Sequence, residues 1–346
     1  MFDVTGADAS YRMVQRAILD VLPASSPLSD AGPSLELLPS APDQPRITAA
    51  SIIEGTAMRA RRVLHEPRAA FAAFLDGTQK SRVAQYLAGG VPIVHATVAA
   101  VIRVRLNRRM TTWRRPVVRH GVYAPRRVLP AELWEALRDR IHAFDDRLDL
   151  VDTSEPEEGA PESDVSATAT HPFSLLEQAV HRVQRERERA ERALAEDWCA
   201  METGALFIDG GISGSDAVAA APCATGVVKS HRTLYADGDA LRVVLALGCR
   251  ERSSAFRIAR SWRTPVASWY LRLRDPMGHD PMWGLVRVEI ADPSRTGGDA
   301  ARLGERADEV SAWVLAEATP LSLPDARWDK MAYGVRDCEE FLRAVC

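Results

Sequence analysis

The chain has 346 residues, 46% of them apolar, which is enough for one elaborated domain with a buried core and added elements. Its formal net charge of −3 gives no global electrostatic case for nucleic-acid binding, so such a partner would need a local basic surface. Five scattered cysteines without a Cys-x-x-Cys pair argue against a zinc site, and no segment approaches the roughly 20 apolar residues of a membrane span, so we expect a cytoplasmic protein.

The first residues predict a helical extension that precedes the core. Apolar positions recur with helical spacing over 9–22, a Pro/Ser-rich loop follows over 23–45, and a second helix is expected over 49–64. We therefore divide the chain into an N-terminal helical extension, 1–65, and a core domain, 66–346.

The first part of the core predicts an antiparallel meander. Strands are expected over 70–75, 81–87 and 92–106, separated by Gly77 and by a Gly-Gly pair, with Asp76 at the end of the first strand. A helix with proline in its first turn follows over 130–144. The segment 151–169 is acidic and rich in small residues and proline, a composition typical of a disordered loop.

A long charged helix, expected over 173–199, leads into a second strand that ends at Asp209. Further strands are expected over 226–230, 241–247, 255–258, 268–273 and 285–290, and helices over 307–316 and 326–345 close the chain. Antiparallel strands followed by helix, strand and helix are the order of a ribonuclease H-like fold. We therefore expect an α/β protein with a mixed sheet flanked by helices.

Two apolar runs stop at Asp-Gly, namely Phe74-Leu75-Asp76-Gly77-Thr78 and Phe207-Ile208-Asp209-Gly210-Gly211. Such a run is typical of a buried strand whose last side chain emerges at the edge of the sheet. Asp-Gly is also a common turn signal, so both aspartates could be ordinary turn residues. If the two strands are neighbours, Asp76 and Asp209 could hold one Mg²⁺ or Mn²⁺ ion through hard oxygen ligands.

Two positions could complete a site for phosphodiester hydrolysis. Glu191 borders the apolar positions of the charged helix and could bring in a third carboxylate, although most charged residues of such a helix form a solvated face. Lys229 lies near the end of the expected strand 226–230 and could contact a phosphate, with a solvent-facing lysine as an equal alternative. Paired metal ions could then activate water and stabilise the leaving oxygen.

Arginines concentrate between residues 103 and 127, beside Trp113 and Tyr123, and form the local basic patch that the net charge conceals. Alternate residues of a strand share a face, so part of this patch could follow a nucleic-acid backbone. The alternative is that these arginines make ion pairs with acidic helices. The candidate nucleic-acid contacts are Arg103, Arg105, Arg108, Arg109, Arg114 and Arg115.

The last helix offers further acids near its expected core stripe. Glu339 borders that stripe, and Asp329 and Tyr333 lie on its flank. Either acid could complete a metal site. An aspartate that opens a helix is more often a cap, so Asp329 is a weaker candidate than Asp76.

The two Asp-Gly strands, the intervening glutamate-bearing helix, Gly-Val-Val-Lys229-Ser, Trp269-Tyr270-Leu271-Arg272-Leu273 and Val286-Arg287-Val288-Glu289 together resemble the NurA nuclease family. The resemblance covers residue 70 to the end and lies in the order of short motifs. It implies a PIWI-related ribonuclease H-like core, Mn²⁺-dependent DNA cleavage, a homodimer, and partnership with a HerA-type hexameric ATPase in DNA end processing, repair or defence.

Carried over by position, Asp76 and Asp209 match the two Asp-Gly metal ligands of that family, and Glu191 is the best match for its helical glutamate. The last helix departs from the family pattern because it offers Asp329, Tyr333 and Glu339 but no histidine. Two other functions therefore stay open. One is a catalytically silent adaptor that docks on an ATPase, and the other is a nucleic-acid-binding module without chemistry.

Overall fold

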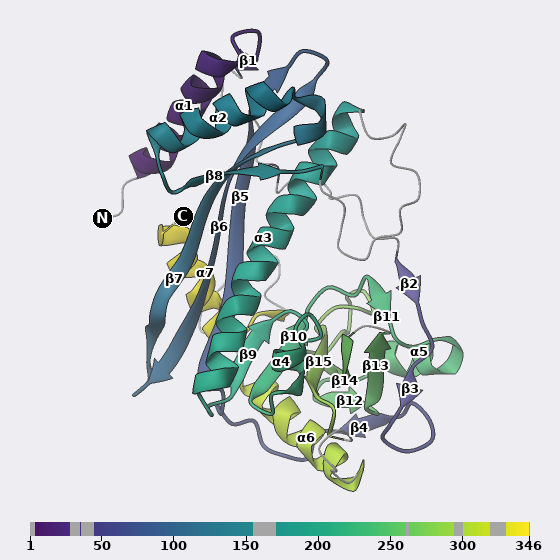
Figure 1. Ribbon diagram of the computed structural model, residues 1–346. Coiled ribbons are helices and arrows are strands. Elements are labelled where there is room, and N and C mark those ends of the chain that lie inside the picture. The colour runs from purple at the N-terminus through teal and green to yellow at the C-terminus, as the bar shows by residue number, and fades with distance from the viewer. Residues whose placement is uncertain are drawn as a thin grey trace.

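The computed structural model describes residues 4–27, 35, 45–154, 171–260, 263–293, 300–318 and 330–345. It is an α/β structure in which a large mixed sheet is flanked by helices (Figure 1). None of the described helices has the length and apolar character that crossing a membrane requires. Asp329 and most of the acidic segment 151–169, from residue 155 onward, lie outside the described residues.

The helices are α1 (Val4–Val21), α2 (Ala131–Phe144), α3 (Pro172–Met201), α4 (Asp216–Ala220), α5 (Gly238–Leu245), α6 (Ala300–Glu317) and α7 (Tyr333–Val345). The strands are β1 (Ser26–Pro27), β2 (Arg46–Ile47), β3 (Ser51–Ile52), β4 (Ala60–Arg62), β5 (Ala73–Leu87), β6 (Val91–Leu106), β7 (Arg109–Ala124), β8 (Leu148–Asp152), β9 (Leu206–Asp209), β10 (Ala224–Val228), β11 (Thr233–Leu234), β12 (Glu251–Ser253), β13 (Phe256–Arg260), β14 (Arg263–Arg272) and β15 (Leu285–Ala291).

The centre of the sheet has the strand order β7-β6-β5-β9-β10. β5, β6 and β7 form an antiparallel meander, β9 is parallel to β5, and β10 is parallel to β9. This is the strand order and orientation of a ribonuclease H-like sheet, so the expected fold class is confirmed. Beyond β10 the sheet continues through β15, β14 and β13, each antiparallel to its neighbour.

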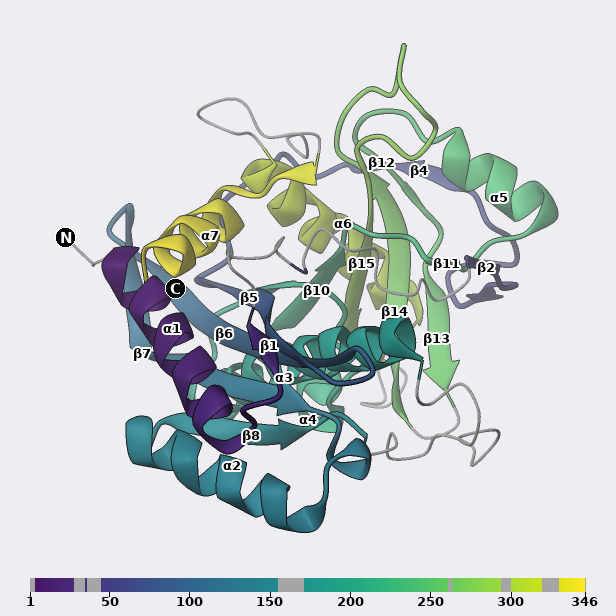
Figure 2. The same cartoon turned by 90° about the horizontal axis from the view of Figure 1, so that it is seen from above.

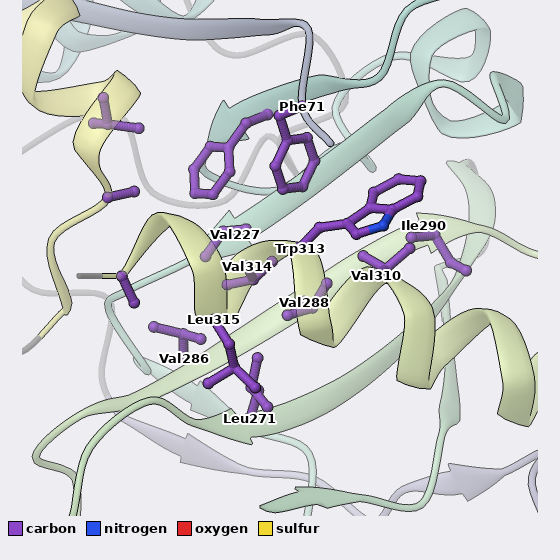
Figure 3. Packing of buried hydrophobic residues seen from close by; sticks show 14 of the residues in the cluster. Phe71, Val227, Leu271, Val286, Val288, Ile290, Val310, Trp313, Val314 and Leu315 are labelled. Carbon is purple, nitrogen blue, oxygen red and sulfur yellow. The ribbon is translucent and has the colours of Figure 1, made fainter. Parts of the chain in front are cut away.

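Helices cover the two faces of this sheet with two separate apolar clusters (Figures 1 and 2). On one face α3 packs Ala190 and Leu194 in a cluster with Leu75 and Ile208. On the other face α6 and α7 share a cluster with Phe74 and Phe207, because successive side chains of a strand point to opposite faces. Figure 3 shows Trp313 and Val310 of α6 beside the strand residues of that second cluster.

Three sequence predictions about these elements are wrong. Gly77 is not a turn, because β5 runs through Asp76-Gly77 and pairs with β6 on both sides of it, without interruption from Ala73 to Val83. Residues 49–64, where a helix was expected, instead contain the strands β3 and β4, which pair with β13 and β12 respectively. The strand expected over 241–247 is largely the helix α5.

Candidate active site

The site lies where the short strands β9 and β10 end beside the longer β5. β9 pairs with β5 only as far as Leu75, which lies opposite Ile208, and β5 then continues to Leu87. Among the described strands, this edge of β5 therefore has no partner from Asp76 until Gln85 and Tyr86, which pair with β1. A cavity of about 950 Å³ occupies this fork between α3 and α7. Its lining includes all the acids that the sequence singled out within the described residues, Asp76, Glu191, Asp209 and Glu339, together with Lys229.

Asp76 is buried on the floor of the cavity. Its carboxylate Oδ1 accepts a 2.8 Å hydrogen bond from the backbone N–H of Gly77. Burial raises the pKa of Asp76 to about 8, and the nearby charge of Asp209 adds to this effect. Lys229 acts in the opposite direction, and Glu191 raises the pKa further. The electrostatic influence of both acids on Asp76 means that the three carboxylates share one neighbourhood.

Asp209 is the last residue of β9 and forms an ion pair with Lys229, with 2.8 Å between Oδ2 and Nζ. The parallel pairing of β9 and β10 places Asp209 opposite Val227, two residues before Lys229. Both side chains are 17% exposed, so they are accessible from the cavity while largely shielded from water. Lys229, for which the sequence predicted a phosphate contact, thus lies beside Asp209 in the lining of the cavity.

Glu191 reaches the cavity from α3. Its Oε1 accepts a 2.9 Å hydrogen bond from Arg187, one turn earlier on the helix. The pKa of Glu191 is raised to about 7, mainly because the carboxyl group is buried. The positive charge of Arg187 acts to lower this pKa, whereas the negative charges of Glu188 and Asp209 act to raise it. A Cβ at Gly77 would lie only 2.2 Å from Glu191 Oε1, so the glycine provides the space that the carboxylate occupies. This close approach, rather than a turn, explains the glycine after Asp76.

The acids approach the cavity from two faces of the sheet. Asp76 lies two residues after Phe74, and Asp209 two residues after Phe207, so each aspartate is on the sheet face that packs against α6 and α7. Glu191 comes from α3, which covers the opposite face. Within the described part of the chain, no three Asp, Glu, His or Cys side chains are grouped closely enough to hold a metal ion as they stand. One oxygen of Asp209 and one of Glu191 are instead engaged by the cations Lys229 and Arg187.

The loop after Asp209 is held by Glu289, a residue for which the sequence predicted no role. Glu289 is 1% exposed on β15, and its Oε2 accepts a 2.9 Å hydrogen bond from the backbone N–H of Ile212. Its Oε1 accepts a second hydrogen bond from Arg287. A Cβ at Gly211 would lie 3.0 Å from Glu289 Oε2, so the loop and the carboxylate are in close contact. Glu289 thus fixes the chain directly after Asp209.

The predicted arginine patch divides into paired and exposed members. Arg105 makes two hydrogen bonds to Glu317 of α6, at 2.8 and 2.7 Å, and Arg103 donates to Asp337 of α7 at 2.5 Å. These two residues therefore fit the alternative of ion pairs with acidic helices. Arg114 lies 3.2 Å from Asp197 of α3, with both side chains about half exposed. Arg108 and Arg109 are exposed at the β6–β7 turn, and Arg115 is exposed farther along β7.

Several basic residues that the sequence did not single out also line the cavity. Arg343 lies on its α7 side, 3.8 Å from the predicted acid Glu339. Across the cavity lie two residues of α3, Arg187 and Arg192, and Arg263 at the start of β14. The cavity is therefore lined by both acids and arginines. The arginines of α3 were not predicted because a charged helix gives no local signal for which residues face a site.

No protein family profile matches the chain, and no curated protein matches it. Among solved structures, the chain is similar to the crystal structure of the NurA nuclease from Sulfolobus solfataricus, with 10% sequence identity and a TM-score of 0.44. The similarity covers 85% of this chain and 81% of that one.

Proposed function

We propose that this chain is a metal-dependent nuclease that hydrolyses phosphodiester bonds of DNA. The observation that carries the proposal is the gathering of Asp76, Glu191 and Asp209 around one cavity, close enough to affect each other's charge, with Lys229 beside them. A cavity lined by both acids and arginines is suited to a substrate that brings its own negative charge together with a cation.

The donor set fits a hard divalent cation, Mn²⁺ or Mg²⁺. All three candidate ligands, Asp76, Glu191 and Asp209, offer carboxylate oxygens, the ligand type that such ions prefer. Burial and mutual repulsion raise the pKa of Asp76 and of Glu191, as expected for carboxylates whose charge is not fully compensated. A bound divalent cation would polarise the phosphate and make an attacking water more acidic.

The residues of the chain would then divide the remaining work. Lys229, already 2.8 Å from Asp209, would donate to a phosphate oxygen as a compact point charge. Glu289 would hold the backbone after Asp209 in place through Ile212. Arginines at the rim would orient the polyanion, because guanidinium groups match phosphate geometry. As partners we propose DNA, a second copy of the chain and a HerA-type hexameric ATPase.

The direct test is cleavage of linear and single-stranded DNA by the purified protein with Mn²⁺ or Mg²⁺. Asp76→Asn and Asp209→Asn should each lower the rate at least about 100-fold, since even residues that only support metal ligands often cost 10 to 100-fold. Asp239→Asn is the matched control, because that side chain is 92% exposed on α5. Full activity in an Asp76→Ala/Asp209→Ala double variant would reject the assignment.

A second function is favoured by the cation contacts of the acids. Lys229 and Arg187 already bind Asp209 and Glu191, so the cavity suits a metal-free adaptor that keeps the fold and docks on an ATPase. Calorimetric titration with Mn²⁺ distinguishes the two functions. An enzyme should bind the ion with an affinity that Asp76→Asn lowers, whereas an adaptor should give no heat that depends on Asp76. Salt-dependent DNA binding without cleavage would instead indicate a binding module.

A further inference from the structure

Two arginines from distant parts of the chain converge over one glycine at the rim of the cavity. A Cβ at Gly214 would lie 3.8 Å from Arg192 Nη2 and 3.9 Å from Arg263 Nη1. Arg192 belongs to α3, whereas Arg263 is the first residue of β14. Both residues and Gly214 line the cavity that contains Asp76 and Asp209. Tertiary folding therefore brings two guanidinium groups to the same place.

This pair of positive charges has no acidic partner among the described residues. Other arginines of α3 do have one, since Arg187 binds Glu191 and Arg189 binds Glu186. Arg263 donates to the backbone carbonyl of Ser213, at 3.3 Å, and Arg192 is exposed. Two like charges held together repel each other, and an anion between them removes that cost. The arrangement is that of a site for an anion.

The loop next to the two arginines is held in place by hydrogen bonds to several elements. Ser215 Oγ donates a 2.5 Å hydrogen bond to Glu196 of α3, and Glu289 holds the N–H of Ile212. Asp216 accepts a 2.8 Å hydrogen bond from the N–H of Thr264, the residue after Arg263. The loop 210–215 is thus tied to both elements that carry the arginines. A ligand that binds there meets a preorganised surface, which lowers the entropy cost of binding.

We infer that Arg192 and Arg263 form a subsite for a backbone phosphate of a nucleic-acid strand, in the same cavity as Asp209. The inference rests on the proposed function and names how its substrate is held. Two guanidinium groups can share the oxygens of one phosphate, and the missing side chain of Gly214 leaves space for it. A contact with phosphate carries no base information, so the subsite positions the strand without selecting its sequence.

The test measures binding of a fluorescent DNA oligonucleotide by anisotropy, in EDTA and at several salt concentrations. Arg192→Gln/Arg263→Gln should bind at least tenfold more weakly, and the slope of log K against log salt should become smaller by about one for each phosphate that the variant no longer binds. Arg189→Gln is the matched control, since Arg189 lies on α3 but does not line the cavity. Unchanged thermal unfolding shows that the variants are folded.

Gly214→Ala provides a second variant that keeps both charges. Its added methyl would lie at van der Waals distance from both guanidinium groups, in the space assigned to the phosphate, so DNA affinity should fall without loss of stability. The subsite is overturned if the double arginine variant binds DNA like Arg189→Gln, or if the wild-type protein does not bind DNA. Loss of binding in a protein that never cleaves DNA would uphold the subsite and reject the nuclease, so the two failures are distinguishable.

Discussion

At the scale of single residues, Gly77 decides where the glutamate of α3 can lie. The three atoms nearest to a Cβ at this position all belong to Glu191, at 2.2 to 2.8 Å. They form the flexible end of a side chain, so a larger residue would displace the carboxylate rather than the backbone. Gly77 thus controls the geometry of the site while it contributes little to the packing of β5.

Gly77→Ala should therefore reproduce the loss of Glu191 without unfolding the protein. We expect nuclease activity to fall to the level of Glu191→Gln, whereas the free energy of unfolding changes by less than about 1 kcal/mol. In a Glu191→Ala background the same substitution should have no further effect on cleavage. Cleavage rates and urea unfolding of the wild type and of the four variants check this, and full activity of Gly77→Ala would contradict it.

His95 gives a pH-dependent prediction that does not involve the site. It lies on β6 directly opposite Arg82, and burial followed by the charge of Arg82 lowers the pKa of His95 to about 4. The unfolded chain protonates a histidine near pH 6.5, so the folded state is fully stabilised above that pH and loses stability between pH 6.5 and about 4. The loss attributable to this residue is up to about 3 kcal/mol.

His95→Gln removes this titration, so the difference in unfolding free energy between variant and wild type should change over that window. Urea unfolding at pH 7.5 and pH 4.5 measures it. His142→Gln serves as control because His142 is exposed on α2. A pH dependence that is the same in His95→Gln and in wild type would show that another group is responsible.

At the scale of elements, the sequence predicted β6, β9, β10 and the long helix α3, but it divided β5 into two strands and did not predict β7 or β8. Asp76-Gly77 resembles a turn locally, yet β6 supplies a partner for every residue around it, with Asp76 opposite Val101 and Gly77 opposite Ala100. The strand continues because of pairing with a distant segment. Such a partner is invisible in a window of a few residues, so the prediction ended the strand too early.

The helix α5 was missed for a similar reason. Its apolar run is short, and periodicity cannot separate a short buried helix from a strand. The carbonyls at and just after its end, of Leu245 and Leu247, accept hydrogen bonds from Arg272, which is fully buried on β14. The helix is therefore completed by a side chain of another element.

The acids of the site were identifiable because their motif is local, whereas the Arg192–Arg263 pair exists only after folding.

Arg105 and Glu317 join the meander to α6 by a shielded ion pair. The side chain of Glu317 is 2% exposed, and Arg105 makes hydrogen bonds to both of its oxygens. Arg105→Met should lower the free energy of unfolding by about 3 kcal/mol, because it leaves a buried carboxylate without its partner. Arg114→Ala, which breaks an exposed pair, should cost less than about 1 kcal/mol. Thermal or urea unfolding compares the two, and equal costs would contradict the structural role of Arg105.

At the scale of the whole molecule, the N-terminal segment shares the sheet of the core. β4 pairs with β12, β3 pairs with β13, and β1 pairs with β5. Glu54 lies in this segment and makes hydrogen bonds at 2.7 and 2.9 Å to Arg252, which is 2% exposed. Arg252 also binds Asp308 of α6. One arginine thus connects the N-terminal segment, the sheet and the last layer of helices.

Glu54→Ala tests whether this segment is part of the cooperative unit. The substitution removes two hydrogen bonds of a buried arginine and the acceptor for the N–H of Ala255, so we expect a loss of about 3 kcal/mol or more in a single unfolding transition. Glu66→Ala is the control, since that side chain is 87% exposed and its ion pair with Arg250 lies at the surface. Two separate transitions, with only the first shifted, would instead mean that residues 1–65 unfold independently of the sheet that carries Asp76 and Asp209.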